Sequence, residues 1–182
     1  SEGDTKVINN ESQAISQIVK DLENSVVSIN VSSNQTSLFG DSFLEESAGT
    51  GIVASSDGVI ITNKHVIGEN TRALSVVRSD GKIYSDVDVV ARDPFIDIAY
   101  LRVNNAEGLV PATLGDSSGV EVGQKVIAIG NALGEFSNTV TSGIISGLGR
   151  PITAGDGFDQ QTLQGLLQTD ASINPGNSGG PL

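Results

Sequence analysis

The sequence contains no cysteine, no methionine and no tryptophan, and it contains a single histidine. The lack of cysteine excludes disulfides, thiolate nucleophiles and sulfur-ligated metal sites. Because a newly made chain begins with methionine, Ser1 indicates processing or a part of a longer protein, and any signal peptide or membrane anchor is expected upstream. The single histidine limits base catalysis by imidazole to one position.

Positive charge is also scarce. The 10 lysines and arginines stand against 22 aspartates and glutamates, which gives a formal net charge of −12 at pH 7. A protein that binds nucleic acid irrespective of its sequence needs clustered basic side chains to neutralise phosphates, so we expect no nucleic-acid partner. The acidic residues show no metal-ligand spacing, and we expect neither a metal nor a cofactor.

Apolar runs are short, and none is long enough to cross a bilayer. From Ser25 onward, runs rich in valine and isoleucine alternate with glycine, asparagine and aspartate turns, a pattern typical of all-β barrels or sandwiches. Strands are predicted at Val26–Val31, Gly51–Ala54, Val59–Thr62, Ala73–Val77, Lys82–Val90, Ile98–Val103, Lys125–Ile129, Thr139–Leu148 and Leu163–Thr169.

Two segments of the first half depart from this strand pattern. Before Ser25, isoleucine, valine and leucine recur at helical spacing and predict a short amphipathic helix within Glu11–Asn24. Between the first two predicted strands, a loop rich in serine and asparagine is expected from Ser32 to Ser47.

A looser stretch from Asn104 to Ser118 is the expected linker between two groups of strands. The predicted units are an N-terminal segment of residues 1–24, a first β-barrel of residues 25–110 and a second group of strands in residues 111–182. The second group contains fewer strands than a closed small barrel requires, so we expect it to be an incomplete barrel.

One serine lies in a glycine-rich motif, Gly176-Asn177-Ser178-Gly179-Gly180-Pro181-Leu182. A serine hydroxyl is a poor nucleophile at neutral pH unless a base takes its proton, and His65 is the only imidazole available. Glycines allow a tight turn that aims several N–H groups at one point, where an oxyanion can bind. The combination indicates acyl transfer at Ser178.

A third group, a carboxylate, is needed to orient the imidazole and stabilise its protonated form. Asp97 precedes an apolar strand, where partial burial makes a charged partner such as His65 favourable. Asp93 is the alternative, but it precedes Pro94 in what reads as an exposed turn. We therefore favour Asp97.

The order His, Asp, Ser along the chain is that of chymotrypsin-like enzymes. Several stretches also resemble the trypsin-like protease domain of the HtrA (Deg) family, and asparagine before the serine is the HtrA form. The stretches that carry this resemblance are Ala48–Val53, Ile61–Val66, Asp97–Ala99, Ile129–Asn131, Val140–Ser146 and Gln168–Leu182.

The resemblance implies two six-stranded Greek-key β-barrels of the chymotrypsin type, of which the second is incomplete in this chain. It further implies that His65 is the general base, that Asp97 orients it and that Ser178 attacks the peptide carbonyl. Backbone N–H groups of Gly176, Asn177 and Ser178 would form the oxyanion hole. A regulatory loop would match the stretch from Leu148 to Leu163, with Arg150 at the position of a family arginine that contacts the catalytic loop.

The activity implied by the resemblance is that of a serine endopeptidase of protein quality control, which degrades unfolded or misfolded proteins through an acyl-enzyme. The resemblance also implies a homotrimer, a location in the bacterial periplasm or at the cell surface, and one or two PDZ domains C-terminal to the protease domain. The missing strands of the second barrel motivate an alternative, a protease-fold binding or chaperone module, or a fragment, without catalytic competence.

Overall fold

The computed structural model describes residues 2–36, 42–131, 139–149, 152–154, 161–163, 165–174 and 176–182. Most of its regular elements are strands, as the valine- and isoleucine-rich runs predict. The helical elements are α1 (Glu2–Leu22), α2 (Lys64–Ile67) and the 3₁₀ turn η1 (Ser117–Gly119). The strands are β1 (Val26–Thr36), β2 (Ser42–Val53), β3 (Val59–Thr62), β4 (Thr71–Val77), β5 (Ile83–Tyr84), β6 (Val87–Arg92), β7 (Ala99–Val103), β8 (Lys125–Gly130), β9 (Thr139–Leu148), β10 (Ile152–Ala154), β11 (Gln161–Leu163) and β12 (Leu167–Thr169).

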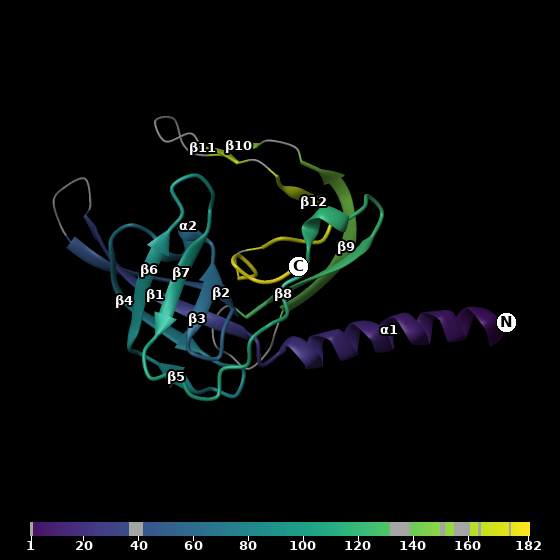
Figure 1. Cartoon of the computed structure of the whole chain (residues 1–182), viewed down its shortest axis with the longest axis horizontal. Coiled ribbons are helices and arrows are strands. Elements are labelled where there is room, and N and C mark those ends of the chain that lie inside the picture. Colours follow the sequence, from purple (N-terminus) through teal and green to yellow (C-terminus); the bar gives the residue numbers. More distant parts are fainter. Residues whose placement is uncertain are drawn as a thin grey trace.

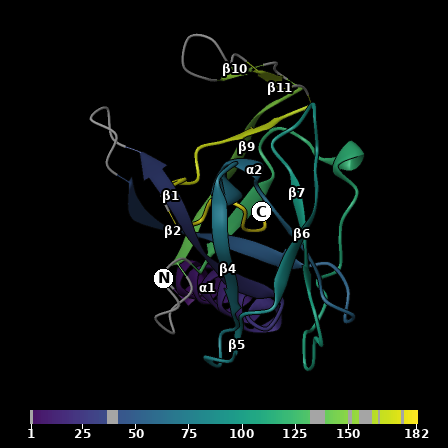
Figure 2. The same ribbon diagram turned by 90° about the vertical axis from the view of Figure 1, so that its left-hand side faces the viewer.

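The first half of the chain forms a seven-stranded antiparallel sheet with the order β5-β4-β1-β2-β3-β7-β6. The sheet curls until β4 approaches β6, which gives a nearly closed barrel (Figure 1). Figure 2 shows the same strands from the side, around a common interior. That interior is filled by aliphatic side chains, among which Ile29, Ile60 and Leu101 are fully buried. Burial of such side chains contributes on the order of 1.5–3 kcal/mol each.

The strand period of two sorts the side chains of β1 and β2 between two environments. Ile29 on β1 points into the barrel. Its side chain lies close to Gly51 on β2, where a Cβ atom would come within 2.8 Å of it. Ser28 and Thr50 are paired across β1 and β2 and belong to the opposite set. Both are buried, and Thr50 is bonded to Gly176 and Asn131 in the second half of the chain.

The prediction of a loop from Ser32 to Ser47 is wrong for the residues that the structure describes. Instead, β1 continues to Thr36 and β2 begins at Ser42, and the two strands pair in continuous register. Serine and asparagine have low strand propensity, but regular antiparallel pairing satisfies the backbone of both strands. The strand predicted from Lys82 to Val90 is also interrupted, because β5 ends at Tyr84 and β6 begins at Val87.

The second half of the chain forms a smaller sheet. Among the described residues it contains a three-stranded antiparallel sheet with the order β12-β9-β8 and a separate hairpin of β10 and β11. This hairpin lies within the stretch expected to be a regulatory loop. The C-terminal residues, yellow in Figure 1, lie between the first sheet and β8, and both sheets donate hydrogen bonds to them.

Helix α1 is longer than predicted and extends away from the barrel alongside the second sheet (Figure 1). An ion pair between Glu11 and Lys125 at the start of β8 joins it to that sheet. Its apolar stripe is only partly covered, since Ile18 is 42% exposed. In the described part of the chain, no helix has the length and apolar character needed to span a bilayer.

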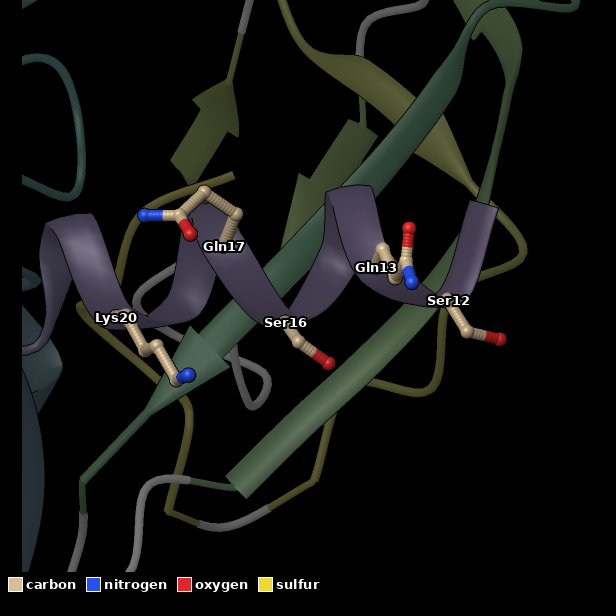
Figure 3. A pocket seen from close by; sticks show the side chains of 5 residues that line it. All are labelled: Ser12, Gln13, Ser16, Gln17 and Lys20. Carbon is tan, nitrogen blue, oxygen red and sulfur yellow. The ribbon is translucent and has the colours of Figure 1, made fainter. Parts of the chain in front are cut away.

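A pocket also lies along α1 (Figure 3). It is lined by polar side chains of that helix alone, namely Ser12, Gln13, Ser16, Gln17 and Lys20. None of the residues predicted to form the site takes part in it. The pocket is therefore separate from the chemistry that the sequence predicts.

Candidate active site

His65 and Asp97 are in direct contact. His65 Nδ1 lies 2.5 Å from Asp97 Oδ2, and the His65 backbone N–H donates to Asp97 Oδ1 at 2.9 Å. One carboxylate therefore holds both the ring and the main chain of the histidine. Because Nδ1 faces the carboxylate, a neutral imidazole in this arrangement carries its proton on Nδ1 and leaves Nε2 free to accept another.

Strand pairing brings these two residues together. His65 follows β3, Asp97 precedes β7, and the two strands are paired antiparallel with Thr62 opposite Ala99. Beyond the strands, the Asp97 carbonyl oxygen accepts hydrogen bonds from the Asn63 side chain at 2.7 Å and from the Lys64 N–H at 3.3 Å. The His65 side chain is 58% exposed and that of Asp97 26% exposed, so the imidazole is open to a substrate while its partner is more enclosed.

Asp93, the alternative carboxylate, has a different task. Its Oδ1 accepts the backbone N–H groups of Phe95 at 2.8 Å and Ile96 at 3.0 Å, which closes the turn before Asp97. These two hydrogen bonds, and then the Lys64 charge, lower the pKa of Asp93 below its ordinary value. The structure thus brings Asp97, and not Asp93, to His65.

Ser178 lies in a tight turn of residues 176–179. Gly176 and Gly179 have φ angles of 122° and 85°, which side chains rarely tolerate. A Cβ atom on Gly179 would also lie 2.1 Å from the Thr50 carbonyl oxygen. Backbone conformation therefore favours glycine at both positions, and the close approach of β2 also requires it at Gly179.

The turn lies beside the segment that carries His65. The Ser178 carbonyl oxygen accepts the Thr50 N–H at 2.9 Å. A Cβ atom at Gly49 would approach that same oxygen at 3.3 Å and the Val66 side chain at 2.5 Å. One glycine of β2 thus touches both the residue after His65 and the nucleophile turn, and this contact brings two regions together that are far apart in the sequence.

Asn177 braces the turn from the second half. Its side-chain Nδ2 donates to the Ser172 carbonyl oxygen at 3.0 Å, and its Oδ1 accepts the Asn174 N–H at 3.1 Å. Its own N–H donates to the Asn174 carbonyl oxygen at 3.1 Å. Asn177 is buried, and these bonds satisfy its polar groups.

Of the three N–H groups expected in the oxyanion hole, that of Asn177 is thus engaged within the loop. The N–H groups of Gly176 and Ser178 have no hydrogen-bond acceptor among the described residues. Backbone N–H groups in or near a protein interior are rarely left without a partner, and two such donors on one tight turn are suited to bind an anion.

Sequence reasoning missed Thr50, which is completely buried. Its hydroxyl donates to the Gly176 carbonyl oxygen at 2.7 Å and accepts the Asn131 N–H at 2.8 Å. Its carbonyl oxygen accepts the Thr62 hydroxyl at 2.7 Å. The available signal was a threonine between two glycines on a strand, which is the pattern of a polar group at a close backbone approach.

The end of β8 forms the other wall of the turn. A Cβ atom at Gly130 would lie 2.5 Å from the Asn177 Cα atom, and one at Gly180 would lie 2.1 Å from the Ile129 carbonyl oxygen. The Ile129 N–H donates to the Pro181 carbonyl oxygen at 3.1 Å. Arg150, expected in the regulatory loop, lies outside the described residues.

Comparison with known proteins places these features in a family. Residues 49–182 match the model of the trypsin-like peptidase domain. The serine protease PepD of Mycobacterium tuberculosis is 46% identical over 74% of this chain and 30% of PepD. The Do-like serine protease HtrB of Bacillus subtilis is 42% identical over 92% of this chain and 38% of HtrB. The periplasmic serine endoprotease DegP of Escherichia coli is 40% identical over 74% of this chain and 27% of DegP.

A solved structure of the HtrA-type protease AlgW with a decapeptide superposes with a TM-score of 0.71. It is 30% identical, and the match covers 91% of this chain and 54% of AlgW. This likeness confirms the predicted all-β, chymotrypsin-like fold. The chain spans less than two fifths of PepD, HtrB and DegP, and about half of the AlgW chain.

Proposed function

The chain belongs to the trypsin-like peptidase domains of the HtrA/Deg family, and on that premise we propose that it carries the catalytic site of a serine endopeptidase. The observation that carries the proposal is the pairing of His65 with both carboxylate oxygens of Asp97, beside a turn that holds Ser178 between two glycines with positive φ angles. A serine nucleophile, a histidine base and a carboxylate that orients the base form one established set of groups for acyl transfer.

In the proposed mechanism, Ser178 Oγ attacks the carbonyl carbon of a peptide bond as its proton passes to Nε2 of His65. The Asp97 carboxylate stabilises the resulting imidazolium. The N–H groups of Gly176 and Ser178 bind the oxyanion, and each such donor is worth on the order of 3 kcal/mol in the transition state. Collapse of the tetrahedral intermediate releases the amine, which takes the proton from His65, and water then hydrolyses the acyl-enzyme.

Asn177 acts in this proposal through the bonds that shape the loop, rather than as an oxyanion donor. Its side chain joins residues 172 and 174 to the turn. Arg150 remains a proposed regulatory contact on the basis of the family resemblance alone.

The proposal extends to the whole protein on the basis of the family resemblance. The substrates would be unfolded or misfolded polypeptides, and the active form would be a homotrimer with PDZ domains following the protease domain. An extracytoplasmic location is supported by the likeness to DegP, whose name describes it as periplasmic.

A fluorophosphonate probe tests the catalytic proposal directly, because it reacts with an activated serine. The folded, full-length protein should be labelled, and Ser178→Ala should abolish the labelling. The variant Ser172→Ala is a matched control, since it removes an exposed serine hydroxyl from the same C-terminal segment. Absence of labelling in a correctly folded protein would favour the alternative, a protease-fold module that binds without catalysis.

A further inference from the structure

We propose that the Thr50 hydroxyl is a positioning group for the oxyanion turn, a role that rests on the proposed function. Thr50 lies in the middle of the first sheet, on β2, yet its side chain reaches the turn around Ser178. It has 0% exposure, and its hydroxyl is used fully, as donor to Gly176 and as acceptor from Asn131. Because Thr50 is fully buried, its hydroxyl is shielded from solvent, which strengthens both bonds.

The bond to Gly176 fixes one particular peptide group. The peptide between Gly176 and Asn177 presents its carbonyl oxygen to the Thr50 hydroxyl and its N–H to the Asn174 carbonyl oxygen. The C=O and N–H of a trans peptide point in opposite directions, so a peptide held at both ends cannot rotate without losing both bonds. This peptide is therefore locked.

The locked peptide lies between the two N–H groups proposed to bind the oxyanion. The Gly176 N–H belongs to the peptide before it, and the Ser178 N–H belongs to the peptide after it. Gly176, with a φ of 122°, has little conformational preference of its own, so contacts such as the Thr50 bond contribute to fixing it. Rotation of the central peptide would change the directions of both donors relative to each other.

The backbone of Thr50 couples this turn to the histidine segment. The Thr50 N–H holds the Ser178 carbonyl oxygen, and the Thr50 carbonyl oxygen accepts the Thr62 hydroxyl three residues before His65. Thr50 therefore contacts the nucleophile turn through its side chain and its amide, and the base segment through its carbonyl. We infer that Thr50 fixes the position of the oxyanion donors relative to Ser178 and His65.

Threonine suits this position for two reasons. A hydroxyl donates and accepts at the same time, whereas an isosteric valine removes the donor to the Gly176 carbonyl oxygen and leaves the N–H of the buried Asn131 without its acceptor. The threonine methyl group also packs against Gly180, where a Cβ atom would lie 3.1 Å from it. Serine retains the hydroxyl and loses only this methyl contact.

The test compares Thr50→Val, Thr50→Ser and a matched control, Tyr84→Phe, in the full-length protein. Tyr84 is buried on β5, and its hydroxyl donates to the Glu107 carbonyl oxygen at 2.5 Å. Tyr84→Phe therefore also removes the hydroxyl of a buried residue, but one that does not bond to the turn. For each variant we would measure the second-order rate constant of fluorophosphonate labelling, the kcat and KM for fluorescent casein, and the thermal midpoint. Activities are compared well below the lowest midpoint.

Thr50→Val should lower the labelling rate and kcat by about tenfold to a hundredfold, with KM changed by less than about twofold, because oxyanion donors act in the transition state. Thr50→Ser should stay within about threefold of the wild type, and Tyr84→Phe should match the wild type. A purely structural role of Thr50 would lower the thermal midpoint without this separation of kcat from KM.

Two failures are distinguishable. If the folded wild-type protein is not labelled at all, the proposed function is wrong and the role of Thr50 falls with it. If the wild type is labelled and Thr50→Val reacts at the rate of Tyr84→Phe, the role of Thr50 is overturned while the function stands. Should Thr50→Val not fold, Thr50→Cys, with its weaker hydrogen bonds, should lower the labelling rate by about threefold to tenfold, and a wild-type rate would overturn the inference.

Discussion

The substitution Asp97→Asn tests the histidine–aspartate pair most sharply, because it changes one atom of the side chain and almost none of its volume. The Asp97 carboxylate uses both oxygens on His65, one for the backbone N–H and one for Nδ1. An asparagine offers only one acceptor. The oxygen is required at the Oδ1 position by the backbone N–H, so the amide NH₂ faces Nδ1.

An NH₂ group facing Nδ1 favours the imidazole tautomer with its proton on Nε2. That tautomer cannot accept the proton of Ser178, and the negative charge that stabilises an imidazolium is also lost. For a triad of this kind the loss in kcat is on the order of 10⁴-fold, which corresponds to about 5.5 kcal/mol in the barrier. The fold should be kept, because the backbone bond from His65 retains an acceptor.

The assay is casein hydrolysis by the full-length protein, with circular dichroism to confirm folding and KM measured alongside kcat. Asp93→Asn is the matched control, since Asp93 contacts Phe95 and Ile96 rather than His65 and an asparagine keeps an acceptor for them. It should remain within about threefold of the wild type. The reasoning is refuted if Asp97→Asn stays within tenfold of the wild type, or if Asp93→Asn loses as much activity as Asp97→Asn.

Two further substitutions, and the acid stability of Asp93→Asn, test the packing and charges around the site. Gly179→Ala should destabilise the protein by several kcal/mol in urea unfolding, because the new Cβ atom would lie 2.1 Å from the Thr50 carbonyl oxygen at a φ of 85°; a wild-type midpoint would contradict this packing. Ser28→Ala should leave the free energy of unfolding unchanged or raise it by up to about 1 kcal/mol, because the buried Ser28 hydroxyl has no partner in the described part of the chain; a clear loss of stability would reveal one. Asp93, whose pKa is lowered by the N–H groups of Phe95 and Ile96, contributes stability above its ordinary value of 3.8, and that contribution is lost as the pH falls through its lower, folded-state value. Asp93→Asn should therefore reduce the loss of stability on acidification below pH 4, and an unchanged acid profile would count against the turn.

Many of the strands were predictable because they carry their pattern locally. The bounds of β3 (Val59–Thr62) and β9 (Thr139–Leu148) follow from apolar runs bordered by turn residues, as predicted. The extension of β1 and β2 through a stretch rich in serine and asparagine was not predictable. Its stability comes from pairing between the two strands, which a propensity reading of either strand alone does not contain.

The site likewise contains residues that the sequence could indicate and residues that it could not. Asp97 was distinguishable from Asp93 in sequence, because one precedes a buried strand and the other precedes a proline. Thr50 was not distinguishable as a contact of the turn, because its partners lie 126 and 81 residues away at Gly176 and Asn131. A local pattern identifies groups that carry chemistry, whereas the groups that place them depend on tertiary contacts.

This dependence has a consequence for control of the site. The nucleophile turn has no regular secondary structure, and its shape comes from bonds to Thr50 on β2 and from close contacts with the end of β8. Those two strands belong to different sheets. A displacement of β8 relative to β2 would therefore move the Asn131 N–H and Gly176 with respect to the Thr50 hydroxyl, while the His65–Asp97 pair, held within the first sheet by β3 and β7, would stay in place. We therefore expect a shift between the sheets to disturb the oxyanion donors more than the His65–Asp97 pair.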